Sequence, residues 1–235
     1  MLALASIAHA GTPAHPTTIS YLALGDSYTI GEGLQPSERW PMQLAHALRS
    51  GRMDDAHVDK PAATAPSVAL DDPRIIATTG WTTDELSSAI DAAQPLGTYG
   101  FVSLAIGVNN QYRGRGVDEY AEQFVVLLDR AIGFAGGRAD RVIVLSIPDW
   151  GATRFGAESG RDVAKIAHEI DAFNAVARER CAARGVAFVD VAPVSRAHGG
   201  EARMLAGDGL HPSAAMYGEW TRLALPVARK LLSQP

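Results

Sequence analysis

Residues 19–33 read ISYLALGDSYTIGEG, and this stretch decides the fold. Its first part, Ile19–Leu24, is a short apolar run, and a glycine, an aspartate and a serine follow it directly. A short apolar run that ends at a turn is typical of a strand buried on both faces of a parallel sheet. The serine of the turn, Ser27, is then expected at the carboxyl end of that strand, where such sheets bind their ligands.

The same pattern recurs along the chain. Further apolar runs bounded by Gly, Pro or Asp predict the strands Phe101–Ile106, Val142–Ile147, Val186–Val191 and, more weakly, Arg74–Ala77. Amphipathic segments between them predict helices over Trp40–Arg49, Thr82–Ala93, Val117–Ala135, from Val163 to a stop at Gly185, and over Ser213–Leu232. Strands that alternate with helices indicate an α/β protein with one parallel sheet and helices on both faces.

Two local signals refine the predicted helices. The run Thr82-Thr83-Asp84-Glu85 is a capping box, which favours a helix that begins there. Pro226 lies inside the last predicted helix and is expected to kink or break it, because proline lacks the N–H that a helix interior needs.

Length and composition limit the classes of protein. The chain has 235 residues, so we expect a leader over residues 1–18 and one domain over residues 19–235. A formal net charge of −5 without a basic stripe argues against a nucleic-acid partner. No run approaches the roughly 18–20 apolar residues of an integral membrane segment. The lone cysteine, Cys181, excludes an internal disulfide and is expected to be an inert, buried thiol. The sequence leaves the oligomeric state open.

The first ten residues, MLALASIAHA, fit two interpretations. The run ends in an A-x-A-like site, which favours a signal-peptide remnant. No basic residue precedes the run and it is short, which favours a disordered leader. A cytoplasmic protein and an exported one therefore both remain open.

Ser27 needs a base to act as a nucleophile, and a candidate lies near the other end of the chain. Residues 208–212 read DGLHP and place Asp208 and His211 three apart at the start of the last predicted helix. There the carboxylate can hold the imidazole in one tautomer while the imidazole takes the serine proton. A simpler interpretation fits as well: Asp208 or Ser213 caps the helix and His211 lies on the surface.

An ester-cleaving serine also needs hydrogen-bond donors for an oxyanion. Asn109 follows the strand Phe101–Ile106 and offers a side-chain amide, and Gly80 follows Arg74–Ala77 and offers a backbone N–H. Asn109 also fits a plain turn, and Gly80 a turn that needs a positive φ. Because the carboxyl ends of parallel strands meet at one sheet edge, we expect Ser27, Gly80 and Asn109 to gather there.

In combination, Ser27, Gly80, Asn109 and His211 resemble the four blocks of the SGNH, or GDSL-type, hydrolases. The resemblance extends over about residues 19–232. It implies a three-layer α/β/α sandwich that is flavodoxin-like, with a central parallel sheet of about five strands. It also implies a serine hydrolase that uses neither a cofactor nor a metal.

The resemblance assigns a role to each residue. Ser27 is the nucleophile, His211 the base, and Asp208 the partner that orients His211. The oxyanion hole consists of the Ser27 N–H, the Gly80 N–H and the Asn109 side chain.

Seven more residues are expected at the pocket: Asp26, Trp81, Asn110, Tyr112, Arg113, Asp149 and Trp150. Asp26 is expected to hold its turn by accepting backbone N–H bonds. Asn110 replaces the aspartate of the family's usual Gly-x-Asn-Asp block, so we expect altered hydrogen bonding without loss of activity. Arg113 has two interpretations: it meets a carboxylate or phosphate of the substrate, or it is a solvated loop residue paired with an acid.

These features predict hydrolysis of small-molecule carboxylic esters through an acyl-enzyme. The family's range implies that thioesters, lysophospholipids and acetylated sugars are also candidates, and we expect small or short-acyl esters. One alternative is a phosphate- or nucleotide-binding module on the turn of residues 25–33, although this turn matches no such motif. Another is a catalytically silent, carbohydrate-binding relative. Arg52–Ser67 is expected to be either a lid or a plain insertion.

Overall fold

The computed structural model describes residues 18–51 and 67–234. Its centre is a five-stranded sheet in the order β2-β1-β3-β4-β5, with every neighbouring pair parallel. The strands are β1 (Tyr21–Gly25), β2 (Arg74–Ala77), β3 (Phe101–Ala105), β4 (Val142–Leu145) and β5 (Ala187–Val189). This order is the flavodoxin-like one.

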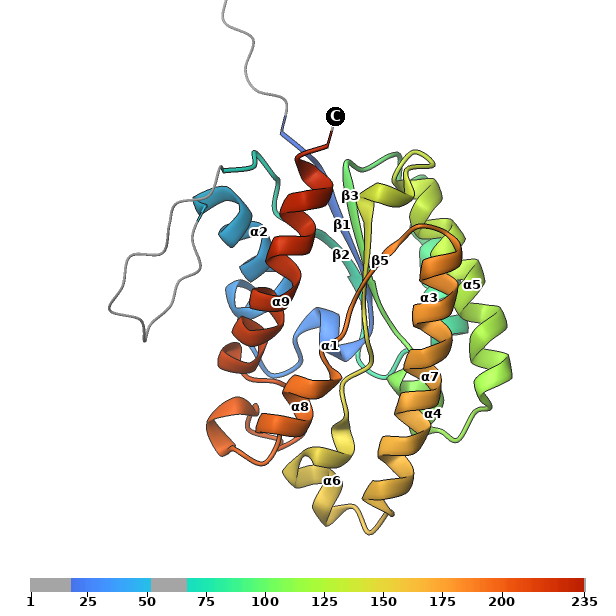
Figure 1. Cartoon of the computed structure of the whole chain (residues 1–235), viewed down its shortest axis with the longest axis vertical. Coiled ribbons are helices and arrows are strands. Elements are labelled where there is room, and N and C mark those ends of the chain that lie inside the picture. Colours follow the sequence, from blue (N-terminus) through green and yellow to red (C-terminus); the bar gives the residue numbers. More distant parts are fainter. Residues whose placement is uncertain (1–17, 52–66, 235) are drawn as a thin grey trace, which may run out of the picture.

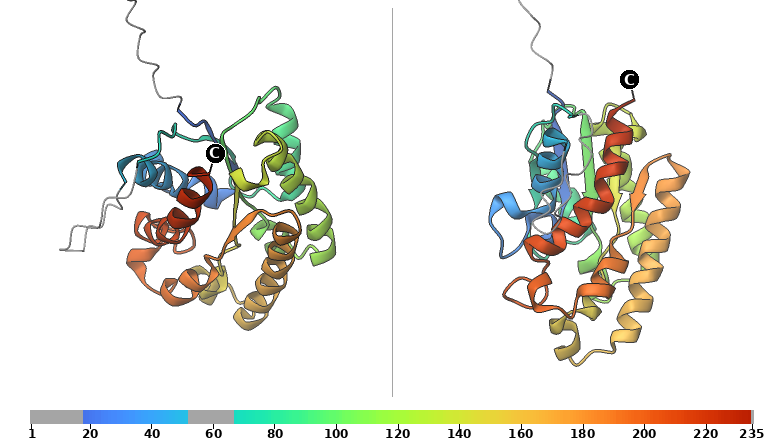
Figure 2. Two further views of the ribbon diagram at one scale, coloured as in Figure 1. Left: turned by 45° about the horizontal axis from the view of Figure 1, so that its top comes forward. Right: turned by 60° about the vertical axis from the view of Figure 1, so that its left-hand side comes forward.

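Helices cover both faces of the sheet (Figures 1 and 2). On one side lie α2 (Trp40–Ser50) and α9 (Ala214–Leu232), and on the other α3 (Thr83–Ala92), α5 (Val117–Phe134) and α7 (Val163–Ala183). Short helices gather toward the carboxyl ends of the strands: α1 (Ser27–Ile30), α4 (Val108–Tyr112), α6 (Arg154–Glu158) and α8 (Ala192–His198). Single 3₁₀ turns occupy Pro36–Glu38, Ala139–Arg141, Trp150–Ala152 and Ala202–Met204. The predicted three-layer α/β/α fold is confirmed.

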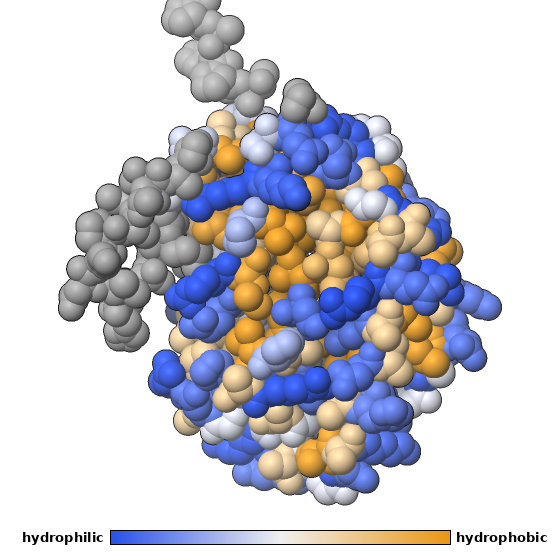
Figure 3. Space-filling view, viewed as in Figure 1, coloured by the Kyte–Doolittle hydropathy of each residue, from blue (hydrophilic) through white to orange (hydrophobic). Residues whose placement is uncertain are grey.

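The core is formed by apolar side chains from the sheet and both helix layers. Its largest fully buried members include Trp40, Trp150, Trp220, Tyr120 and Phe124. Hydrophobic side chains also gather on the surface over and beside α9, between bands of hydrophilic ones (Figure 3). No helix in the described ranges has the length and apolar character needed to cross a bilayer.

Several predicted boundaries differ from the observed ones. The first strand begins at Tyr21, because Ile19 forms only an isolated bridge with Leu70. The other strong runs end one or two residues early, where the chain turns out of the sheet. Of the kink or break expected at Pro226, the break does not occur: α9 continues from Ala214 to Leu232. Its buried stripe extends on both sides of the proline, and this packing outweighs one missing N–H.

Two other expectations fall on the undescribed parts of the chain. The leader lies outside the described residues except for its last position, and so does the stretch after Gly51 that was expected to be a lid or insertion, except for Ser67. Cys181 is buried, and desolvation raises the pKa of its thiol to about 12, so it is an unreactive thiol at neutral pH.

The strand register sets the position of the site. Ala77, Gly25 and Ala105 stand side by side as the last residues of β2, β1 and β3. The chain leaves β1 toward β2 on one side and later returns to β3 on the other, so this row is the topological switch point. The segments that carry Ser27, Gly80 and Asn109 follow directly from this row.

Candidate active site

Ser27 is the first residue of α1, immediately after the end of β1. Asp26 is the N-cap, and its carboxylate accepts a hydrogen bond from the Tyr28 N–H at 3.0 Å. This confirms that Asp26 holds the turn. The N–H of Ser27 has no acceptor within its own helix, because the first N–H groups of any helix are unpaired there. Ser27 therefore has a hydroxyl and a free N–H at the switch point.

The carboxyl group of Asp26 is fully buried. Desolvation raises its pKa to about 7, although backbone hydrogen bonds oppose the shift. With a pKa of about 7, the Asp26 carboxyl group changes its charge near neutral pH. The same group precedes Ser27 in the sequence and caps its turn by accepting the Tyr28 N–H.

The turn before α9 brings Asp208 and His211 into direct contact. Asp208 Oδ2 lies 2.6 Å from His211 Nδ1. Asp208 Oδ1 accepts the backbone N–H groups of Leu210 and His211 at 2.9 and 3.0 Å. Desolvation acts to raise the pKa of Asp208, but these hydrogen bonds bring it below its ordinary value. The helix cap is Ser213, which accepts the Met216 N–H, so Asp208 does not serve as the cap of α9.

Tyr28 connects the serine turn to the histidine. Its ring packs against the His211 imidazole with 5.4 Å between ring centroids, and its carbonyl oxygen accepts a hydrogen bond from the Tyr217 hydroxyl at 2.9 Å. The described residues include no direct hydrogen bond between Ser27 and His211. In ligand-free structures such catalytic contacts are often longer than in the substrate complex. The roles of Tyr28 and Tyr217 are not visible in the sequence, because no motif indicates a contact between segments this far apart.

The candidate oxyanion donors lie on two linked segments. Asn109 Nδ2 donates to the Trp81 carbonyl oxygen at 2.9 Å, which joins α4 to the turn after β2. An amide carries two N–H groups, so one remains for a ligand. Gly80 has φ +87°, a conformation that favours glycine, and its N–H has no acceptor among the described residues.

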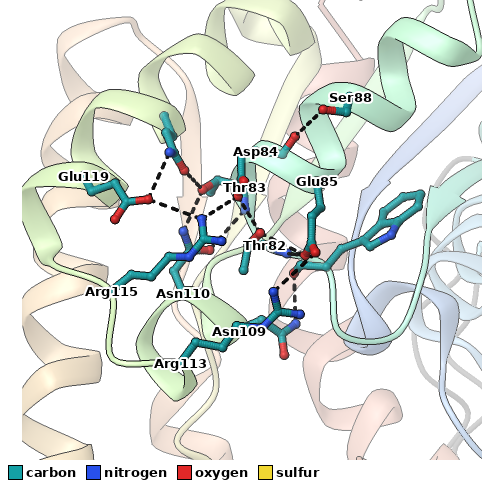
Figure 4. Close-up of polar contacts among 12 residues, drawn as sticks. Thr82, Thr83, Asp84, Glu85, Ser88, Asn109, Asn110, Arg113, Arg115 and Glu119 are labelled. Atoms are coloured by element: carbon teal, nitrogen blue, oxygen red, sulfur yellow. Dashed lines mark hydrogen bonds and ion pairs between the residues drawn. The ribbon is translucent and has the colours of Figure 1, made fainter.

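Asn110 supports this arrangement through its contacts with Thr83 (Figure 4). Its side chain is fully buried: Oδ1 accepts the Thr83 N–H at 3.1 Å, and Nδ2 donates to the Thr83 hydroxyl at 2.7 Å. The Thr83 hydroxyl donates in turn to Gln123 on α5. The predicted capping box forms at the start of α3, where the Glu85 carboxylate accepts a hydrogen bond from the Thr82 N–H at 2.8 Å. Asn110 therefore holds α4 against the start of α3.

Charged side chains on the same segments are largely paired. Arg113 forms an ion pair with Glu85 at 3.3 Å and donates to the Gly80 carbonyl oxygen at 2.6 Å. Arg115 forms an ion pair with Asp84 (Figure 4). Of the two interpretations of Arg113, the structure shows the pairing with an acid.

The remaining expected pocket residues are Tyr112, at the end of α4, and Asp149 and Trp150, which follow β4. Tyr112 is partly exposed, and its ring meets the edge of Trp150 with 5.2 Å between centroids. Trp150 is buried and donates from Nε1 to Gln111 at 2.7 Å. Asp149 is also buried; its carboxylate caps the following 3₁₀ turn and forms an ion pair with Arg196 at 2.8 Å. The Asp149 carboxylate is thus engaged in structural contacts.

A flavodoxin-like sheet with these groups at its switch point defines the class of the protein, a doubly wound α/β protein with a ligand site at the carboxyl ends of its strands. The chain belongs to the GDSL-like lipase/acylhydrolase family, whose model matches residues 23–218. It is therefore a carboxylic ester hydrolase that acts on small-molecule esters.

Solved structures with the same fold include several esterases. A crystal structure of TesA matches with a TM-score of 0.64 and 19% identity, covering 90% of this chain and 99% of the other. An inhibited esterase, EstA from a Pseudoalteromonas species, matches with a TM-score of 0.62 and 16% identity, covering 92% of this chain and 99% of the other. A variant acetyl xylan esterase from Geobacillus stearothermophilus matches with a TM-score of 0.64 and 18% identity, covering 89% of this chain and 94% of the other. No curated protein matches the chain.

Proposed function

We propose that the protein hydrolyses carboxylic esters through an acyl-enzyme formed on Ser27, with His211 as the base and Asp208 as its orienting partner. The observation that carries this proposal is the bond between His211 Nδ1 and Asp208 Oδ2. With Nδ1 engaged, Nε2 is the nitrogen left to accept the serine proton.

In the proposed first half-reaction, Ser27 Oγ attacks the ester carbonyl carbon while His211 takes its proton. The negative charge on the carbonyl oxygen is stabilised by the Ser27 N–H, the Gly80 N–H and the free N–H of Asn109. His211 then gives its proton to the departing alkoxide, and an acyl-serine ester remains.

In the second half-reaction, His211 deprotonates a water molecule, which attacks the acyl-serine carbonyl through the same oxyanion site. Collapse of the intermediate releases the carboxylic acid and returns the proton to Ser27 Oγ. Atoms and charges balance with water as the only co-substrate, and no residue beyond those named is needed.

The proposed substrates are small or short-acyl esters. Acetylated sugars are the favoured natural type, since an acetyl xylan esterase shares the fold. Thioesters and lysophospholipids are the other candidates. The phosphate-binding alternative is disfavoured, because the Asp26 carboxylate already caps the helix terminus at which a phosphate would bind.

The test uses p-nitrophenyl acetate and butyrate with the full-length protein and its Ser27→Ala variant. We expect hydrolysis by the wild type, a burst of p-nitrophenol when deacylation is slow, and no hydrolysis above background by Ser27→Ala. Ser37→Ala, which changes an exposed serine in a 3₁₀ turn, is the matched control and keeps full activity. Equal rates for wild type and Ser27→Ala would contradict the proposal. Absence of hydrolysis of any ester, with tight binding of xylan fragments instead, would favour the silent carbohydrate-binding relative.

A further inference from the structure

A pocket flanks the turn that carries Asp208 and His211. Its volume is about 320 Å³, and its walls are Arg154 together with small or apolar residues of segment 200–209. This volume is at the lower end of the range for small-molecule sites. Neither Ser27 nor His211 lines it, so it is a separate space on the flank of the proposed catalytic turn.

The guanidinium of Arg154 lies directly against Gly209. A β-carbon at position 209 would fall 2.6 Å from Arg154 Nε and 2.7 Å from Nη2. Only a residue without a side chain allows this approach, and Gly209 also has φ +72°. The positive charge of Arg154 therefore lies against Gly209, which is one residue along the chain from Asp208 and two from His211.

The backbone of Arg154 is anchored to the same turn. Phe155 N–H donates to the Gly209 carbonyl oxygen at 3.0 Å, and Thr153 caps α6 by accepting the Gly156 N–H at 3.1 Å. Gly156 itself packs so closely on the Trp150 carbonyl oxygen that a β-carbon would lie 2.4 Å from it. A short helix fixed at these points holds the backbone of Arg154 next to the turn that carries Asp208 and His211.

The charge of Arg154 is not neutralised by the protein. In the described part of the chain, its guanidinium has neither a hydrogen bond nor an ion pair, whereas Arg113 and Arg203 are both paired with glutamates. The groups that set the pKa of Asp208 are His211 and backbone N–H donors, not Arg154. A planar cation with free donors beside an open pocket matches a carboxylate or a phosphate.

We propose that this pocket binds an anionic group of the substrate, held by Arg154 while the ester is cleaved at Ser27. This inference rests on the proposed function and narrows its substrates to esters that carry a carboxylate or phosphate away from the scissile bond. An acylated acidic sugar would supply the carboxylate, and an acylated glycerol phosphate would supply the phosphate.

The kinetic test compares two pairs of substrates matched in acyl group: acetylated glucose with acetylated glucuronate, and monobutyrylglycerol with butyrylglycerol 3-phosphate. We expect the wild type to prefer the anionic member of at least one pair in kcat/KM. Arg154→Gln should reduce this anionic-over-neutral ratio roughly ten- to hundredfold, as expected for one charge-assisted hydrogen-bond pair. Arg154→Lys should retain part of it. The pair that shows the preference identifies the anion.

Two controls make the result specific. Arg203→Gln removes an equal charge from a nearby exposed arginine that is paired with Glu201, and it should leave the ratio unchanged. Gly207 lines the pocket with open space around its α-carbon, so Gly207→Glu should lower the ratio while Gly207→Gln should not. No preference in the wild type for either anionic ester, or an equal loss for neutral and anionic esters in Arg154→Gln, would overturn the proposal.

A binding test separates this inference from the proposed function. Calorimetry on the Ser27→Ala protein with glucuronate and with glycerol 3-phosphate needs no turnover. Binding that is lost in the double variant Ser27→Ala/Arg154→Gln supports the anion pocket even if no ester is hydrolysed. If esters are hydrolysed but neither anion binds, the pocket assignment is wrong and the esterase assignment stands.

Discussion

The amide of Asn109 has two N–H groups. One holds the turn at Trp81 in place, and the other is free to make the proposed oxyanion contact. We expect Asn109→Ala to lower kcat on p-nitrophenyl acetate by on the order of 10²–10³, with little change in KM, because the lost contact is formed mainly in the transition state.

The control for Asn109→Ala separates catalysis from structure. Arg113→Gln removes the other tie to the same turn, the bond to the Gly80 carbonyl oxygen, without removing an oxyanion donor. It should cost far less activity. Equal losses in the two variants would mean that Asn109 acts only by holding the turn, and full activity of Asn109→Ala would exclude it from the oxyanion hole.

Asp26 should make stability depend on pH. Its folded-state pKa is about 7, above the ordinary value of 3.8, because burial disfavours the carboxylate. The stabilising contribution of the neutral acid is therefore complete below about pH 4 and is lost as the pH rises through about 7, by on the order of 4 kcal/mol for a shift of this size.

Asp26→Asn tests this dependence, because asparagine can still cap α1 by accepting the Tyr28 N–H. Urea unfolding of both proteins at pH 4.5, 6 and 7.5 gives the difference in free energy of unfolding. We expect this difference to move in favour of the variant as the pH rises. A difference that stays constant with pH would mean that Asp26 does not titrate in this range.

At the scale of elements, the contact between α3 and α4 positions the segment that carries Asn109, the proposed oxyanion donor. Asn110 occupies the position at which the family usually has an aspartate. Its amide accepts a hydrogen bond from the Thr83 N–H and donates one to the Thr83 hydroxyl. Asn110→Ala leaves that buried N–H without a partner, which should cost about 1–3 kcal/mol of the free energy of unfolding. Chemical denaturation measures this loss.

Asn110→Asp is the matched substitution. A carboxylate can still accept the Thr83 N–H, so this variant should keep more of the stability than Asn110→Ala. Both should retain Ser27-dependent activity, at a reduced level in the alanine variant because α4 also carries Asn109. An alanine variant as stable as the wild type would show that α3 and α4 are held together by other contacts.

The elements that the sequence predicted are those with a clear pattern. The strands were recognised as short continuous apolar runs bounded by Gly, Pro or Asp, and the five long helices by apolar residues that repeat every third and fourth position. Helices α1, α4, α6 and α8 have four to seven residues, too few for a period to be visible. Pro226 misled the prediction for α9, because tertiary packing on both of its sides was not visible in the sequence.

At the scale of the whole molecule, topology explains why part of the site was predictable. Ser27, Gly80 and Asn109 each follow a strand of the one parallel sheet that the sequence predicts, so we could expect them at one edge, and the structure shows their strands β1, β2 and β3 side by side. The direction of a side chain at the rim depends on its particular neighbours. Spacing therefore did not show that Arg113 turns back to Glu85, or that Arg154, outside every motif, keeps its charge free.

Gly25 is the residue at which fold and site depend most directly on each other. It ends β1 between Ala77 of β2 and Ala105 of β3, and a β-carbon there would lie 2.1 Å from Thr29 Oγ1 and 2.5 Å from the Ala105 carbonyl oxygen. Gly25→Ala must therefore displace α1 or separate β1 from β3. We expect it to lose several kcal/mol of stability, as strain in a packed interior does, and activity with it, since Ser27 moves with α1. Thermal unfolding and esterase rates measure both effects.

Gly133→Ala, on α5 with open space around its α-carbon, is the control and should be neutral or stabilising by up to about 1 kcal/mol. If Gly25→Ala were as stable and active as the wild type, the close approach of α1 to β3 would not be needed to position the nucleophile.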